Sequence, residues 1–146
     1  AMFGLEQQLK EKKIILDPFQ KGNIAQYWID EGYVWLMHAR SAVPNNPKNI
    51  GGKHPDGSVG RGVQYPFIKP LEGQYHAEWE EEKLDPWKEV VRNVIKNHFV
   101  NDNSFLECIS TEFIPLTDYG EGSTYSLFDN ASACAQWIKN EIEKVN

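Results

Sequence analysis

Short apolar runs alternate with helical patterns along the chain, and this order constrains the fold more than any other feature of the sequence. The apolar runs occupy 14–17, 33–39 and 106–114. Apolar side chains recur at helical spacing over about 3–12, 23–29, 85–95 and 130–145. A run that is apolar on both faces is typical of a buried parallel strand, and alternation of strand and helix indicates a parallel sheet covered by helices. We therefore expect one α/β domain over 1–146.

Several predicted helices carry recognisable end signals. Asn23 is placed to cap the second helix, and Gly32 follows it as a C-terminal stop. Asp85 is placed to cap the next helix, with Pro86 at the first helical position. The last helix is expected to begin at about Asn130.

A long segment rich in Pro, Gly and Asn, 41–73, interrupts this regular order. A segment of that length without clear periodicity is usually a functional loop or disordered. A further short strand is expected at 63–67 or at 74–79, and the sequence does not separate these two alternatives.

The charge and composition of the chain disfavour two kinds of partner, nucleic acids and membranes. The formal net charge is −6, and the chain has only three arginines, Arg40, Arg61 and Arg92, so a nucleic-acid-binding role is disfavoured. No apolar run approaches the roughly 20 residues that span a bilayer, so no membrane association is expected. The two cysteines, Cys108 and Cys134, form neither a disulfide framework nor a metal-binding knuckle, which favours a cytoplasmic location.

Three of the apolar runs end in a side chain that can bind a metal ion. These side chains are Asp17, His38 and Glu112. The carboxyl ends of parallel strands meet at one rim, where active sites gather. Buried charges are costly unless they are paired or coordinate a cation. Two carboxylates and an imidazole suit Mn²⁺, with Mg²⁺, Co²⁺ or Zn²⁺ as alternatives.

Each of these three residues also has a purely structural interpretation. Asp17 precedes Pro18 and could end a strand as a turn residue, His38 could be a core histidine, and Glu112 could simply pair with Arg40. The shared position at strand ends favours the metal site for the set as a whole.

Side-chain alternation assigns residues to the two faces of the sheet. One face is expected to carry Leu36, His38 and Arg40 from one strand, and Leu106, Cys108, Ser110 and Glu112 from another. Ile109, Thr111 and Phe113 are expected to face the covering helices.

Candidate substrate-binding residues lie near the same rim or in the long loop. Arg40 and Arg61 could contact substrate oxygens, and His76 could join the site if 74–79 is a strand. Surface placement is the alternative for the loop residues.

Six short motifs resemble the carboxyl-terminal half of the xylose-isomerase-like TIM barrels, the sugar isomerase and epimerase superfamily. They are IILDPF, YVWLMHAR, GRGVQYPF, LDPWKEVV, ISTEFIP and DYGEGSTYS. The resemblance implies a partial (β/α)8 TIM barrel, roughly strands five to eight with their helices. It implies divalent-metal ligands at Asp17, His38 and Glu112, and an acid/base role for Glu112 next to a substrate carbonyl. Arg40 is nearer to His38 than the substrate-binding arginine of that family is to its histidine.

The chain is shorter than a full barrel of about 250 residues. Strands one to four of the family, with the first metal-binding glutamate, have no counterpart. An open half-barrel would expose sheet edges and apolar strand faces. We therefore expect a homo-oligomer, a partner chain that supplies the first half-barrel, or a fragment of a longer enzyme.

Two functions follow as expectations. The first is a metal-dependent sugar or sugar-phosphate isomerase or epimerase, or a related lyase, that moves a proton next to a carbonyl. The second is a non-catalytic carbohydrate-binding or regulatory half-barrel, for which aromatic residues at 12% of the chain are suited.

Overall fold

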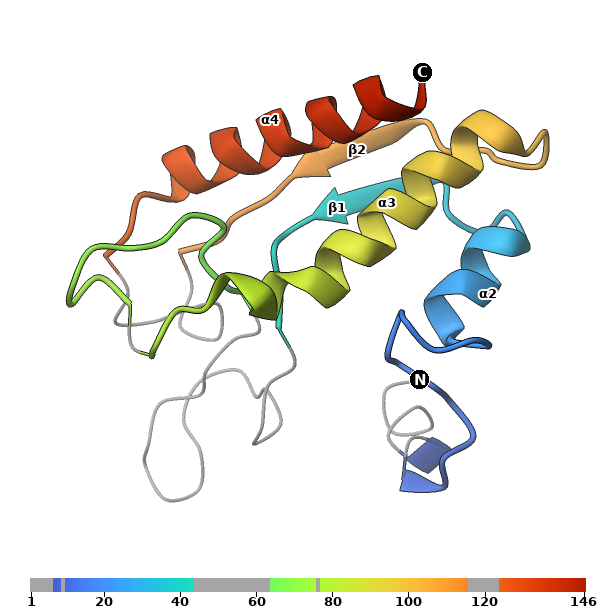
Figure 1. Cartoon of the computed structure of the whole chain (residues 1–146), viewed down its shortest axis with the longest axis horizontal. Coiled ribbons are helices and arrows are strands. Elements are labelled where there is room, and N and C mark those ends of the chain that lie inside the picture. The colour runs from blue at the N-terminus through green and yellow to red at the C-terminus, as the bar shows by residue number, and fades with distance from the viewer. Residues whose placement is uncertain (1–6, 9, 44–63, 76, 116–123) are drawn as a thin grey trace.

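Two parallel strands form the sheet of this protein (Figure 1). The structure is a computed structural model, and it describes residues 7–8, 10–43, 64–75, 77–115 and 124–146. The strands are β1 (Leu36–Ala39) and β2 (Cys108–Thr111). Leu36 lies opposite Cys108, and Ala39 lies opposite Thr111. Because parallel neighbours require a crossover connection, and this one contains a helix, the expected α/β class is confirmed.

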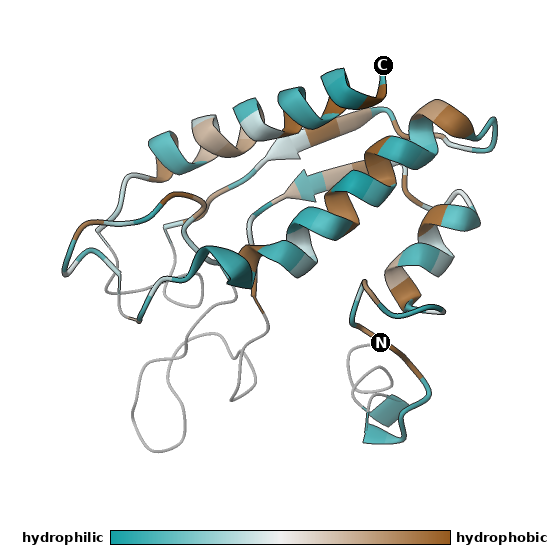
Figure 2. Cartoon of the chain, viewed as in Figure 1, coloured by the Kyte–Doolittle hydropathy of each residue, from teal (hydrophilic) through white to brown (hydrophobic). Residues whose placement is uncertain are grey.

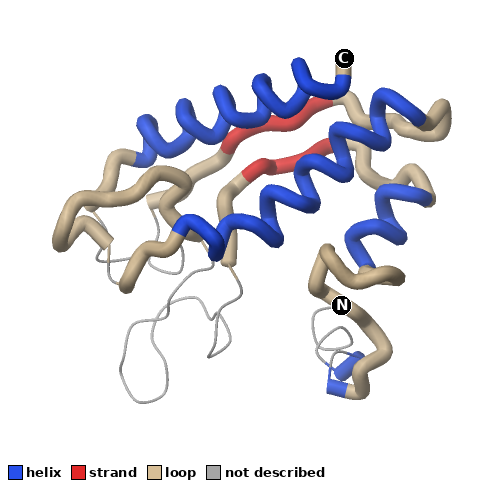
Figure 3. The backbone as a smooth tube through the Cα atoms, in the orientation of Figure 1, coloured by secondary structure: helices blue, strands red, loops and turns tan. Residues whose placement is uncertain are grey.

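Long helices lie along one face of this short sheet (Figure 1). They are α3 (Asp85–Val100), which follows the 3₁₀ helix η1 (Glu81–Leu84), and α4 (Leu127–Val145). A shorter helix, α2 (Ile24–Asp30), packs against α3. Figure 3 shows how short the strands are beside these helices and the loops that join them.

The end signals of α2 act as the sequence predicts. The side chain of Asn23 accepts a hydrogen bond from the backbone N–H of Gln26 at 2.8 Å. Gly32 stops the helix with a positive φ of 70°. A Cβ atom at Gly32 would lie 2.6 Å from the carbonyl oxygen of Asn103, so a close backbone approach also requires glycine here.

The beginnings of α3 and α4 differ from expectation. Asp85 does not cap α3, because η1 runs directly into the helix and leaves Leu84 at the cap position without a side-chain hydrogen bond. Pro86 does lie in the first turn, as predicted. Helix α4 begins before Asn130, because Ser126 accepts a hydrogen bond from the backbone N–H of Asp129 and caps it.

The core lies between the sheet and the helices. Its fully buried members are Ala39, Val91, Ile95, Cys134 and Ile138. Met37 of β1, Ile109 of β2 and Phe113, two residues after β2, pack against them, as alternation predicts. An aromatic group of Phe67, Trp87 and Trp137 packs there as well. In Figure 2, hydrophobic and hydrophilic residues alternate along α3 and α4, the pattern of helices with one face on a core.

The strand expected at 14–17 is not formed. Leu16 is 53% exposed, and this segment turns into α2, with the carbonyl of Ile15 accepting from the N–H of Ile24. The apolar run therefore forms the irregular segment that leads into α2, and it pairs with no strand of the described sheet. The positive φ of Lys12, 54°, marks the preceding change of chain direction.

The further strand expected at 63–67 or 74–79 is also absent from the described residues of both segments. Gln64 makes only an isolated antiparallel bridge with Ala42. The resemblance assigns the strand of His38 to barrel strand six and the strand of Glu112 to barrel strand eight, with strand seven between them. In the structure β1 and β2 pair directly with each other, so no strand lies between them.

Candidate functional site at the carboxyl ends of the strands

Three charged or titratable side chains meet where the two strands end. Arg40 directly follows β1, Glu112 directly follows β2, and His38 lies opposite Ser110 in the parallel register. A guanidinium nitrogen of Arg40 lies 2.5 Å from Oε2 of Glu112, and Nδ1 of His38 lies 3.5 Å from the same oxygen. The convergence of these three residues on one rim follows from strand alternation and the parallel register.

The members of this His38–Arg40–Glu112 cluster differ in exposure. The side chain of Arg40 is 15% exposed, that of Glu112 37% and that of His38 57%. The guanidinium therefore lies deepest and compensates the carboxylate, while the imidazole stands nearest to solvent. This arrangement keeps a carboxylate oxygen and an imidazole together at a surface that a small molecule can reach.

The face of the sheet that carries the cluster is polar near the strand ends and apolar near their beginnings. Cys108 and Leu36 are exposed on it, and Leu36 has 55% of its surface accessible. Ser110 is partly buried beside His38.

A buried glutamine holds the two strand ends in place. Gln64 is 1% exposed; its side-chain oxygen accepts from the N–H of Ile114 at 2.8 Å, and its nitrogen donates to the carbonyl of the same residue at 3.3 Å. The next residue, Tyr65, donates its N–H to the carbonyl of Ser41 at 2.9 Å. Tyr65 thus holds the chain at Ser41, just after Arg40, and Gln64 holds it at Ile114, two residues after Glu112.

Further buried polar groups support this brace, the set of hydrogen bonds from Gln64 and Tyr65 to the two strand ends. Gln64 also donates to the hydroxyl of Tyr125 at 3.0 Å, and burial raises the pKa of that phenol despite the opposing hydrogen bond. Ser41, fully buried, donates its hydroxyl to the carbonyl of Tyr65 at 2.5 Å. No local sequence signal marks Gln64 or Ser41 as part of the site, because their hydrogen-bond partners lie far along the chain.

Asp17 is a turn residue, which is the structural interpretation given above for this position. Its carboxylate accepts hydrogen bonds from the N–H of Phe19 at 3.0 Å and from the side chain of Gln20 at 2.9 Å, which is the pattern of an Asx turn. The turn precedes α2 and lies apart from the rim of the sheet (Figure 1). The structure brings His38 and Glu112 together and leaves Asp17 elsewhere.

The described residues at the rim supply fewer metal-binding side chains than a metal site needs. In the part of the chain that the structure describes, no three His, Cys, Asp or Glu side chains come together as metal ligands. His38 and Glu112 supply two suitable donors, and Arg40 already binds the carboxylate oxygen nearest to the imidazole. Any metal at this rim would need further ligands from outside this group.

Two of the predicted substrate-binding residues, Arg61 and His76, lie outside the described residues. Arg40, the third, is in the cluster, where it binds Glu112.

Among the described helices, none combines the length and the apolar character needed to cross a bilayer.

The comparisons with known proteins identify no relative. No protein-family model matches the chain, and no curated protein or solved structure matches it either.

Proposed function

We propose that the chain is part of a sugar or sugar-phosphate isomerase or epimerase, in which Glu112 moves a proton at the carbon next to a carbonyl. The observation that carries the proposal is the meeting of His38, Arg40 and Glu112 at the carboxyl ends of two parallel strands. Catalytic residues of α/β enzymes concentrate at such strand ends. The resemblance to the sugar isomerase and epimerase superfamily points to the same reaction class.

The chemistry assigns a separate role to each member of the cluster. The Glu112 carboxylate takes the proton from the carbon, the C–H electron pair forms a carbon–carbon double bond, and the carbonyl oxygen becomes an enediolate oxygen. Arg40 and His38 flank the carboxylate and would donate hydrogen bonds to that oxygen as its negative charge develops. Return of the proton from Glu112 to the neighbouring carbon, with the proton of the adjacent hydroxyl moving to the enediolate oxygen, completes isomerisation. Epimerisation needs protonation of the same carbon from its opposite face, by a second acid that a partner chain would supply.

Isotope exchange tests this proposal without knowledge of the product. The chain is incubated in D₂O with a panel of ketoses and aldoses, free and phosphorylated, and deuterium next to the carbonyl is followed by NMR. We expect exchange with the unmodified chain and its loss in Glu112→Gln. Glu107→Gln, an exposed glutamate just before β2, is the matched control and should retain exchange. Absence of exchange with every sugar, with and without added Mn²⁺, would refute the proposal.

A divalent metal, Mn²⁺ first, is a separate part of the proposal. It would polarise substrate oxygens, with His38 and Glu112 as two of its ligands and the others from a partner chain. Metal analysis after equilibration with Mn²⁺ should show binding that His38→Ala reduces. Asp17→Ala should leave it unchanged, because the Asp17 carboxylate is held in its own turn. The metal assignment fails if the unmodified chain retains no metal.

We also propose that a second copy or a partner chain covers the open edges and the exposed apolar side chains of this sheet. Neither outer edge of the β1–β2 pair joins another strand within the described residues. The side chains around the beginnings of the strands are large, apolar and exposed: Tyr33, Trp35, Leu36 and Phe105. Parallel sheets are normally covered on both faces. Light scattering over a range of concentrations should detect self-association, and a stable monomer that binds no partner would contradict this part.

The second candidate function is metal-independent carbohydrate binding without catalysis. It is favoured by the Arg40–Glu112 pair, because a carboxylate that is already bonded to a guanidinium is suited to holding sugar hydroxyls. Calorimetry with simple sugars in the presence of a chelator separates the two functions. Binding without isotope exchange favours this second function, whereas exchange establishes the first.

A further inference from the structure

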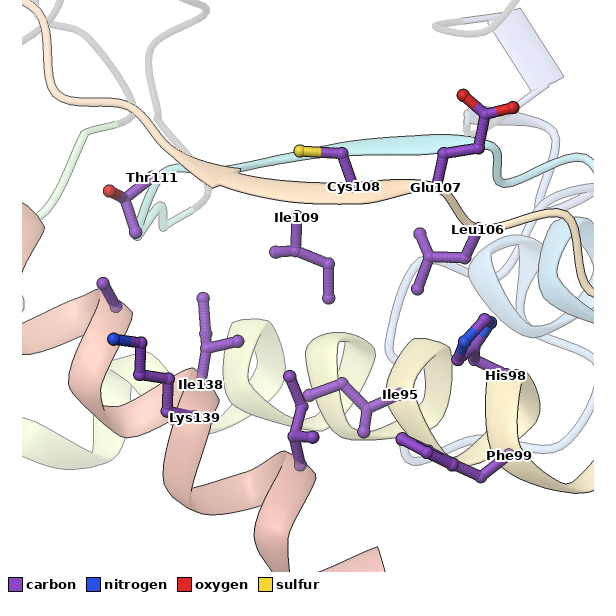
Figure 4. Close-up of a pocket in the computed structure, with 12 residues that line it drawn as sticks. Ile95, His98, Phe99, Leu106, Glu107, Cys108, Ile109, Thr111, Ile138 and Lys139 are labelled. Carbon is purple, nitrogen blue, oxygen red and sulfur yellow. The ribbon is translucent and has the colours of Figure 1, made fainter. Parts of the chain in front are cut away.

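A half-open cavity of about 460 Å³ lies between α3, α4 and β2, on the helix-covered side of the sheet (Figure 4). It is separate from the His38–Arg40–Glu112 cluster, none of whose members lines it. Its apolar walls are formed by Ile95, Phe99, Leu106, Ile109, Ile138 and Ile142. Its volume falls within the range of sites for small organic ligands, roughly 300–1,000 Å³.

The cavity begins where the core ends. Ile95 and Ile138 are buried core residues that also form its inner wall. The wall also includes the small side chain of Ala135 on α4, and Phe99 remains 42% exposed. Leu106 was expected on the face that carries Glu112, but it points into this cavity with Ile109 (Figure 4). Apolar walls without a partner lose dispersion contacts that a bound apolar group would restore.

The two ends of the cavity differ in chemistry. Thr111 and Lys139 lie at one end, and His98 and Phe99 lie at the other (Figure 4). The His98 ring packs edge-on against Phe99, and its Nδ1 lies 3.4 Å from the hydroxyl of Ser104. One end therefore offers a cation, while the other is lined by aromatic rings.

The cation at the polar end is available to a ligand. Three other cations of these helices are used in ion pairs, Lys88 with Glu81 and both Arg92 and Lys144 with Glu141, whereas Lys96 of α3 lies outside the cavity lining. No carboxylate among the described residues forms an ion pair with Lys139. The only acidic residue that lines the cavity, Glu107, directs its carboxylate away from the apolar interior (Figure 4).

We propose that this cavity binds a small amphipathic anion, a medium-chain carboxylate, with its apolar chain among the isoleucines and its head group at Lys139 and Thr111. The cavity is too small for a helix, whose diameter with side chains is about 10–12 Å. The cation at one end complements an anionic head group. The proposal does not depend on the function assigned to Glu112.

Calorimetry with decanoate, below the concentration at which it self-associates, tests the proposal on the full chain. Decanol is the neutral comparison, because it has the same chain without the charge. Ala135→Leu fills the cavity, with Ser132→Leu as the control that adds the same side chain to the exposed surface of α4. Lys139→Gln removes the head-group contact, with Lys96→Gln as the control at an exposed lysine of α3 outside the cavity lining.

Decanoate should bind more tightly than decanol, and Ala135→Leu should weaken decanoate binding about tenfold or more by overpacking the site. Lys139→Gln should weaken it about two- to fivefold, the range of a solvent-exposed ion pair. Both controls should bind as the unmodified chain does, and circular dichroism should show intact helices in every variant. Absence of decanoate binding, or binding that neither Ala135→Leu nor Lys139→Gln changes, would overturn the proposal. Self-association that Ala135→Leu abolishes would assign the cavity to a second copy instead.

Discussion

The carboxylate of Glu141 joins α3 to α4, and its removal gives a well-defined test of the packing described above. The Glu141 side chain is only 9% exposed. Its two oxygens bind Arg92 of α3 at 3.1 Å and Lys144 of α4 at 2.6 Å. Glu141→Gln keeps the size and shape of the side chain and removes the charge that both cations contact.

The expected loss in the free energy of unfolding is about 1–2 kcal/mol at pH 7. Hydrogen bonds to charged groups contribute about 1.5–3 kcal/mol. The side chains of Arg92 and Lys144 are 42% and 66% exposed, so water screens both contacts and reduces this value. For a chain of this length, the loss corresponds to a decrease in Tm of roughly 2–8 °C.

The effect should depend on pH with a definite sign. Burial alone would raise the pKa of Glu141, but the hydrogen bonds and charges of Lys144 and Arg92 together outweigh it and lower the pKa below the usual 4.5. A lowered pKa in the folded state stabilises the protein above the pKa of the unfolded state. That stability is lost as pH falls through the folded-state pKa. The stability difference between the unmodified chain and Glu141→Gln should therefore be largest near pH 7 and shrink below about pH 4.

Urea unfolding followed by tryptophan fluorescence, from pH 7 to pH 3.5, measures this difference directly. Glu143→Gln is the matched control, because it removes an exposed carboxylate two residues farther along α4. It should change stability by less than about 0.5 kcal/mol. Equal destabilisation by Glu141→Gln at both ends of the pH range, or none at pH 7, would refute the reasoning.

Three further predictions test other parts of the fold. Gly32→Ala should destabilise the chain by at least about 1 kcal/mol more than Gly73→Ala in urea unfolding, since both glycines have positive φ but only at Gly32 would a Cβ meet a backbone oxygen at 2.6 Å; equal losses would contradict that close approach. Asn130→Ala should lower the unfolding free energy by about 2–4 kcal/mol, because the Asn130 oxygen, almost fully buried, accepts from two backbone N–H groups; a loss below about 0.5 kcal/mol would show that these donors find other partners. In the folded chain a thiol reagent at pH 8 should modify Cys108, which is exposed, and spare Cys134, whose pKa burial raises to about 12; rapid reaction of both thiols without denaturant would contradict the buried position.

The helices were predictable because their signals are local. Asn23 caps α2, Gly32 stops it and Pro86 lies in the first turn of α3, as the sequence predicts. The run at 14–17 misled because a short apolar segment has the same composition whether it enters a sheet or leads into a helix. Its outcome depends on whether a neighbouring strand is present, and that information does not lie within the segment.

The site was predictable where strand periodicity determines it and not where distant contacts do. Alternation along β1 and β2 correctly places His38, Arg40 and Glu112 on one rim, and the Arg40–Glu112 pair was one of the stated alternatives. Asp17 was included because it follows an apolar run, and the absence of a strand there removes that reason. The brace from Gln64 joins positions 50 residues apart, so no local pattern reveals it.

The most direct test of the proposed site is to locate where a sugar binds. Amide chemical shifts of the ¹⁵N-labelled chain, recorded during titration with the sugar that exchanges deuterium fastest, report the binding position residue by residue. We predict that the largest changes fall at 38–41 and 110–114, and that Glu112→Gln reduces them. Changes confined to the turn around Asp17 or to the cavity between α3 and α4, or no changes at saturating sugar, would contradict the assignment of the site to the carboxyl ends of the strands.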